Sequence, residues 1–108
     1  RIKYPEQLQQ RINKQPLSPL YLADKTTLIN IMEMVSGLFL SKDIVYQNGK
    51  PAYLVDLAKA FEWLFNIRIG DCYQKHEDVI KRKPGKLTGF LNGLVELIKK
   101  EHDKKGYR

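Results

Sequence analysis

Residues 53–83 decide the fold of this chain, and their sequence is YLVDLAKAFEWLFNIRIGDCYQKHEDVIKRK. Over residues 53–65 the apolar side chains recur at helical spacing and form one wide face, which predicts a helix. Asn66 can end that helix. Gly70 and Asp71 can then turn the chain and cap a further helix that runs to about the end of the stretch. Two helices joined by a tight, glycine-containing turn are typical of a helix-turn-helix motif.

An amphipathic helix is predicted upstream, at about residues 25–41. Asp24 or Thr26 can cap its start. Its apolar positions recur at helical spacing and are Leu28, Ile31, Met32, Val35, Leu38 and Phe39. The residues that fill much of the opposite side are polar: Asn30, Glu33 and Ser36.

Between these helices we expect a small β element near residues 44–53. Asn48-Gly49 is the commonest signal for a two-residue hairpin, in which both residues take positive φ. Because Pro51 cannot donate a ladder hydrogen bond, any strand after the turn is short or lies at an edge.

Two further segments complete the predicted organisation. A short helix opened by Pro5 and a proline-rich connection form an N-terminal unit, residues 1–22, ahead of a helical domain at residues 23–105. Residues 83–86 (KPGK) break the helical pattern, and Thr88 caps a last helix. The apolar stripe of this last helix comprises Leu91, Leu94, Val95 and Ile98. The predicted fold class is therefore mainly α, a domain of three to five helices.

Bulk composition points to a polyanionic partner. The chain has 108 residues, with 19 basic and 12 acidic side chains and a net charge of +7. From Lys75 to Arg108 there are ten basic and five acidic residues, so the surplus concentrates at the C-terminal end. Solvated helix faces in a basic protein are the alternative explanation. The sequence has no apolar run of membrane-spanning length and no signal peptide, and its single cysteine fits a reducing compartment, so we expect a cytoplasmic protein without a membrane partner.

Motifs that would support catalysis or cofactor binding are absent from the sequence. Cys72 and His76 are four residues apart, which places both on one side of a helix. They provide half a zinc site, which needs three or four ligands, and two of the three groups of a nucleophilic triad. A packed thiol beside a boundary histidine is the simpler interpretation. No glycine-rich phosphate loop is present, so we expect neither an enzyme nor a bound metal or cofactor.

A basic segment at the end of the helix after Gly70 is the strongest functional signal. Arginine and lysine can neutralise phosphates, while arginine and glutamine can bond base edges in a major groove. A hydroxyl at the start of the last helix can add a phosphate contact. The candidate DNA-binding residues are Tyr73, Gln74, Lys75, Lys81, Arg82, Lys83, Lys86 and Thr88. Of these, Tyr73, Gln74 and Arg82 are the candidates for base recognition, and Lys99 is a further candidate for a phosphate contact.

Several short strings together resemble the C-terminal region of the RteC family, over roughly residues 22–100. The strings are Leu57-Ala58-Lys59-Ala60-Phe61, Leu64-Phe65-Asn66-Ile67, Gly70-Asp71, Tyr73, Arg82-Lys83, and Thr88 with Phe90-Leu91-Asn92. The resemblance implies a winged-helix DNA-binding fold and a regulator that activates transcription of excision genes in bacterial conjugative transposons. His76 stands where the resemblance leads us to expect an aromatic or apolar residue.

Two hypotheses follow for the function. The first is a DNA-binding transcription regulator linked to a mobile element, with double-stranded DNA as its partner. The second is a protein-interaction or homodimerisation module without direct DNA contact, whose surface is the last helix with Phe90, Leu94 and Leu97. The chain begins at Arg1 and not at Met, which leaves room for an upstream domain of the same protein as a further partner.

Overall fold

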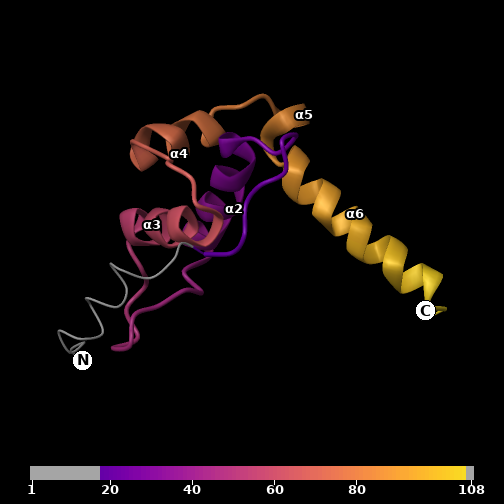
Figure 1. Cartoon of the computed structure of the whole chain (residues 1–108), viewed down its shortest axis with the longest axis horizontal. Helices are drawn as coiled ribbons and strands as arrows, with labels where there is room; N and C mark the ends of the chain where they lie inside the picture. The colour runs from indigo at the N-terminus through magenta and orange to yellow at the C-terminus, as the bar shows by residue number, and fades with distance from the viewer. Residues whose placement is uncertain (1–17, 107–108) are drawn as a thin grey trace.

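The structure is a computed structural model that describes residues 18–106. Its helices are α2 (Leu28–Ser41), α3 (Leu54–Phe65), α4 (Cys72–Ile80), α5 (Pro84–Leu87) and α6 (Gly89–Lys104) (Figure 1). The predicted mainly α class is therefore confirmed. The predicted N-terminal helix that Pro5 opens lies outside the described residues. No helix within residues 18–106 combines the length and the apolar character that a membrane span requires.

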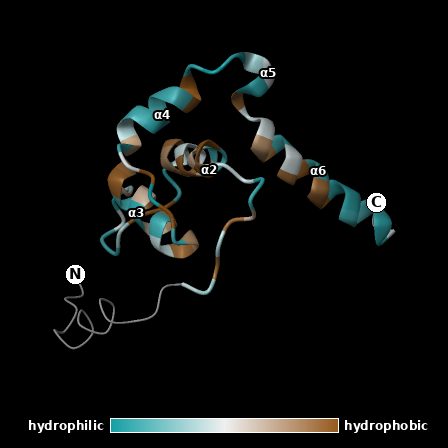
Figure 2. Ribbon diagram, turned by 45° about the horizontal axis from the view of Figure 1, so that its top comes forward, coloured by the Kyte–Doolittle hydropathy of each residue, from teal (hydrophilic) through white to brown (hydrophobic). Residues whose placement is uncertain are grey.

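The core is built around α2, which contacts α3, α4 and α6. In Figure 2, α2 is seen end-on between these helices. Its most buried apolar residues are Ile31, Met32 and Val35, and they pack with Leu54, Leu57, Ala58, Ile69, Cys72 and Val79. Because neighbours cover α2 on several sides, Glu33 and Ser36 are also buried, at 2% exposure each. The amphipathic pattern predicted for this helix is wrong at these two positions.

The helix ends show which capping predictions hold. Asp71 caps α4 as predicted, since its Oδ1 accepts the backbone N–H groups of Tyr73 and Gln74, each at 3.1 Å. Asn66 ends α3 with a φ of 54°, and its side-chain amide donates to the Ser18 carbonyl at 2.6 Å. At the start of α2 the cap is Thr27, so the assignment to Asp24 or Thr26 was wrong.

The predicted β element is reduced to an isolated antiparallel bridge between Val45 and Pro51, and residues 18–106 contain no strand. The Gly49 N–H donates to the Tyr46 carbonyl at 2.8 Å, and Gly49 has a φ of 87° whereas Asn48 has no positive φ. The predicted two-residue hairpin turn is therefore wrong. Asn48 instead bonds locally, because its Oδ1 accepts the Lys50 N–H at 2.9 Å.

Tyr46 links this turn to the start of α3. Its hydroxyl accepts the N–H of Tyr53 at 3.0 Å and donates to Asp56. Tyr53 is the N-cap residue of α3 and makes no side-chain cap bond of its own, so the Tyr46 hydroxyl satisfies one of the free donors there. The bond to Asp56 raises the pKa of Tyr46 above the ordinary value, because the neutral phenol is needed as the donor.

Candidate nucleic-acid interface

One side of α4 is exposed to solvent, as an interface with DNA requires. Cys72 and Val79 anchor the helix in the core, and Asp71 fixes its first turn. Tyr73 is 60% exposed, and the exposed face continues through Gln74, Glu77, Ile80 and Lys81. Helix α4 is therefore anchored to the core on one side and exposed to solvent on the other.

The exposed face of α4 carries little net charge of its own. The negative charges of Glu77 and Asp78 balance the positive charges of Lys75 and Lys81. The Gln74 amide donates to Asp78 at 3.0 Å, and the Lys81 ammonium lies 3.7 Å from the same carboxylate. An amide can pair with adenine, and a carboxylate can accept from cytosine. This face is therefore better suited to hydrogen bonding with bases than to neutralising phosphates.

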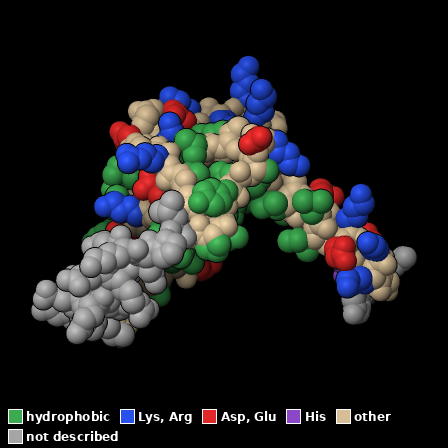
Figure 3. All heavy atoms as spheres, in the orientation of Figure 1, with side chains coloured by type: hydrophobic (Ala, Val, Ile, Leu, Met, Phe, Trp, Pro, Cys, Tyr) green, Lys and Arg blue, Asp and Glu red, His purple; other side chains and the backbone are tan. Residues whose placement is uncertain are grey.

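Positive charge gathers instead on the loop after α4 and on α5. Lys83 and Lys86 are exposed, and neither forms an ion pair with any residue from 18 to 106. Figure 3 shows Lys and Arg side chains standing out from the surface over this part of the chain. Lys75 is half-buried. Thr88 is exposed and precedes α6, but its side chain makes no cap bond, so the capping role predicted for it was wrong.

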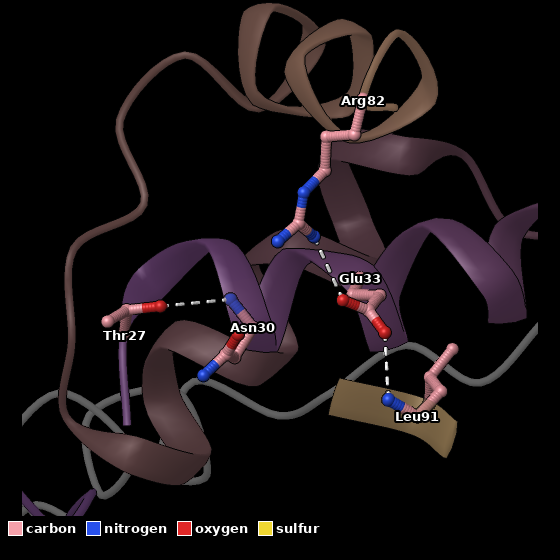
Figure 4. A network of polar contacts seen from close by, with 5 residues as sticks. All are labelled: Thr27, Asn30, Glu33, Arg82 and Leu91. Atoms are coloured by element: carbon pink, nitrogen blue, oxygen red, sulfur yellow. Dashed lines mark hydrogen bonds and ion pairs between the residues drawn. The ribbon is translucent and has the colours of Figure 1, made fainter. Parts of the chain in front are cut away.

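Arg82 points away from this surface and into the protein (Figure 4). Its guanidinium Nη1 donates to Glu33 Oε1 at 3.0 Å, and the Glu33 side chain is 1% exposed while that of Arg82 is 24% exposed. The other carboxylate oxygen of Glu33 accepts the backbone N–H of Leu91 at 2.8 Å. Arg82 therefore joins the segment after α4 to α2, and its guanidinium is occupied by Glu33, although the sequence placed it among the base-recognition candidates.

Glu33 performs the capping that Thr88 does not. Leu91 lies in the first turn of α6, where backbone N–H groups lack partners within the helix. A carboxylate at this end also interacts favourably with the helix dipole. Glu33 from α2 therefore caps α6 across the fold and fixes where α6 leaves the core.

Cys72 and His76 are both engaged in packing. Burial raises the pKa of the Cys72 thiol, and Asp71 adds to the effect. The His76 Nδ1 lies 2.7 Å from the Ser36 hydroxyl, and its ring meets Phe39 edge-on at 5.7 Å between centroids. No group of three or more histidine, cysteine, aspartate or glutamate residues within residues 18–106 is arranged to hold a metal ion. The imidazole makes the kind of edge contact that an aromatic residue would make at this position.

Comparisons with known proteins place the chain in a family. The family described as RteC protein matches over residues 3–105, nearly the whole chain. Part of an Exportin-T from Chaetomium globosum is also similar, with 33% identity over 93 residues, which cover 81% of this chain but 9% of that protein. No solved structure matches. On the family match, together with the helical architecture described above, the chain belongs to the RteC family.

Proposed function

We propose that this domain binds double-stranded DNA as a transcription regulator of a bacterial mobile element, with α4 as the helix that enters the major groove. Membership of the RteC family fits a regulator associated with conjugative transposons. The observation that carries the DNA proposal is the exposed side of α4, with Tyr73 and Gln74 at its start and the exposed Lys81, Lys83 and Lys86 at and beyond its end.

Each residue type has a separate role in the proposed complex. The side chains of Tyr73 and Gln74 contact base edges, because both are exposed at the start of α4. Their backbone N–H groups are bonded to Asp71, which fixes this first turn. Lys83 and Lys86 contact phosphates, since they stand clear of ion pairs within the described part of the chain. The chain after α4 forms α5, so the proposed docking follows a helix-turn-helix arrangement of α3 and α4 and requires no wing.

A salt-titrated binding assay tests the proposal. Fluorescence anisotropy of a labelled duplex is followed from about 50 to 200 mM salt, where phosphate contacts lose affinity steeply. Lys83→Gln/Lys86→Gln removes two proposed contacts, so we expect the logarithmic salt slope to fall by about 2. The matched control is Lys50→Gln/Lys104→Gln, which removes the same charge from the turn after Tyr46 and from the last residue of α6. Absence of duplex binding at the lowest salt would overturn the proposal.

Association of two copies through α6 is a second candidate function, and the exposure of this helix favours it. No residue of α6 is buried, and Leu97 and Ile98 are 64% and 71% exposed. At its root the apolar surface continues into a hollow of about 250 Å³ lined by Met34, Gly37, Leu38 and Leu91. One chain therefore carries both an apolar arm and an apolar hollow, which is the self-complementarity that a twofold dimer requires.

A further inference from the structure

We propose a second phosphate-binding site for the DNA backbone, formed by Lys59, Trp63 and Arg68 at the opposite end of α4 from Lys83 and Lys86. The inference rests on the proposed DNA binding and extends it to residues of α3 and of the segment that joins α3 to α4. It predicts that α4 is flanked by cationic groups at both of its ends.

The proposed site is an open cleft of about 440 Å³. Its lining residues are Lys59, Glu62, Trp63, Ile67, Arg68 and Gly70. Lys59 and Trp63 are four residues apart on α3, so they share one side of that helix. Trp63 is 51% exposed, and Lys59 and Arg68 are also exposed.

The chemistry of the cleft favours an anion. The lysine ammonium, the arginine guanidinium and the indole N–H can donate hydrogen bonds but cannot accept them. Neither cation forms an ion pair with a residue in the described range. Glu62 is the acidic residue in the lining, but its Oε2 already accepts the Ile69 N–H at 2.7 Å and its side chain is half-buried. A phosphodiester can accept two bonds from a guanidinium and a further one from the indole.

The position of the cleft relative to α4 selects a DNA backbone as the source of that phosphate. Gly70, with a φ of 78°, directly precedes the α4 cap at Asp71, so the cleft lies at the start of the helix. Lys83 and Lys86 lie beyond its end. With 9 residues α4 is about 13 Å long, close to the roughly 12 Å width of a major groove. In the proposed complex, the two cationic sites contact phosphates on the two sides of that groove.

In Figure 3, Lys and Arg side chains stand over α3 and α4 on one side of the view and over α5 on the other. Lys59 lies on α3 and Arg68 in the segment before α4, whereas Lys83 and Lys86 follow α4, so the two pairs can be replaced separately.

Trp63 provides a direct reporter, because it is the single tryptophan of the chain. Its fluorescence and its quenching by acrylamide are measured during titration with the duplex, while anisotropy of the labelled DNA reports binding independently. We expect duplex binding to shield Trp63 from acrylamide. In Lys59→Gln/Arg68→Gln the salt slope should fall by about 2, so that raising salt from about 50 to 200 mM costs about tenfold less affinity than in the wild type. Lys50→Gln/Lys104→Gln again serves as the charge-matched control.

The outcomes separate this inference from the proposed function. If the wild type binds the duplex while Trp63 stays equally accessible and the double variant keeps the wild-type slope, the second site is overturned and DNA binding by α4 stands. If inorganic phosphate shields Trp63 as well as the duplex does at equal phosphate concentration, the cleft binds small anions and the assignment to a DNA backbone fails. If the wild type binds no duplex, both proposals fail. Trp63 shielding is measured on the wild type, so the test does not depend on the variant's folding.

Discussion

Replacing Glu33 by glutamine should destabilise this protein far more than an ordinary loss of one surface charge. The carboxylate accepts one bond from the Arg82 guanidinium and another from the Leu91 N–H. A glutamine amide has one acceptor oxygen. If Arg82 donates to that oxygen, the Leu91 N–H faces the NH₂ group, and if Leu91 donates to it, the Arg82 guanidinium faces the NH₂ group. In Figure 4 the two partners bind different oxygens of the carboxylate, and the amide of glutamine keeps only one of these two positions as an acceptor.

The size of the effect follows from the burial of the two charges. Removing one member of a buried ion pair costs about 3–5 kcal/mol when the remaining charge has no access to water. The Arg82 side chain is 24% exposed and can regain some hydration, which reduces the cost. The lost cap at the start of α6 adds about 0.5–1 kcal/mol. We therefore expect Glu33→Gln to lower the free energy of unfolding by about 2–4 kcal/mol, equivalent to a fall in Tm of about 10 °C or more.

Urea and thermal unfolding followed by circular dichroism measure this change, with Glu96→Gln as the matched control. Glu96 makes the same kind of pair on the surface, 3.9 Å from Lys99 and 74% exposed, so its replacement should change stability by about 0.5 kcal/mol or less. Hydrogen exchange at the Leu91 amide should also accelerate in Glu33→Gln. If Glu33→Gln and Glu96→Gln unfold at the same urea concentration, the buried carboxylate does not hold α6 and the reasoning is refuted.

Four further predictions concern other parts of the structure. Ser36→Ala removes the bond to His76 and should cost about 1 kcal/mol in urea unfolding; an unchanged midpoint would contradict this. Because burial raises the pKa of Cys72, its thiol should be alkylated much more slowly at neutral pH in the native than in the urea-unfolded protein. The stability that the protonated thiol contributes should be fully present below the pKa of the unfolded state. It should be lost as the pH rises through the higher pKa of the folded state. Because the bond to Asp56 raises the Tyr46 pKa, spectrophotometric titration of the wild type should contain a tyrosine ionisation above the ordinary range that Tyr46→Phe removes. Leu97→Gln/Ile98→Gln should abolish concentration-dependent association in sedimentation without lowering stability, because both side chains are exposed; unchanged sedimentation of an associating wild type would exclude α6.

Local patterns predicted the elements whose causes are local. Apolar spacing placed α2 and α3, and Asp71 caps α4 through the two backbone N–H groups next to it in the chain. Helix α4 was expected to reach about residue 83 but ends at Ile80. The run after it is lysine, arginine and lysine, whose composition does not distinguish a last helical turn from a loop. The Arg82 side chain bonds to α2, and this contact could not be predicted from neighbouring residues.

Polar residues of α2 were the main point at which sequence reasoning failed. Glu33 and Ser36 were assigned to the side opposite the apolar face, but α4 and α6 cover that side. Their partners, Arg82, Leu91 and His76, lie 40 to 58 residues away in the chain. A helix that neighbours contact on several sides can bury polar as well as apolar residues, and buried polar groups need hydrogen-bond partners. The number of contacting helices, which a single helix pattern does not contain, decides this outcome.

The basic segment after α4 separates into residues with different physical roles. Within this segment Arg82 was the candidate for base recognition, since a guanidinium can form two bonds to guanine. The structure places that guanidinium on a carboxylate that also caps α6, so releasing it would leave Glu33 buried with one partner. Lys83 and Lys86 form no ion pair with any residue from 18 to 106. A count of charges treats these side chains as equivalent, but their burial differs. The Arg82 guanidinium bonds to the carboxylate that also caps α6, so it connects the segment after α4 to α2 and α6. Lys83 and Lys86 are exposed beside it, so their charge is accessible to a partner from solvent.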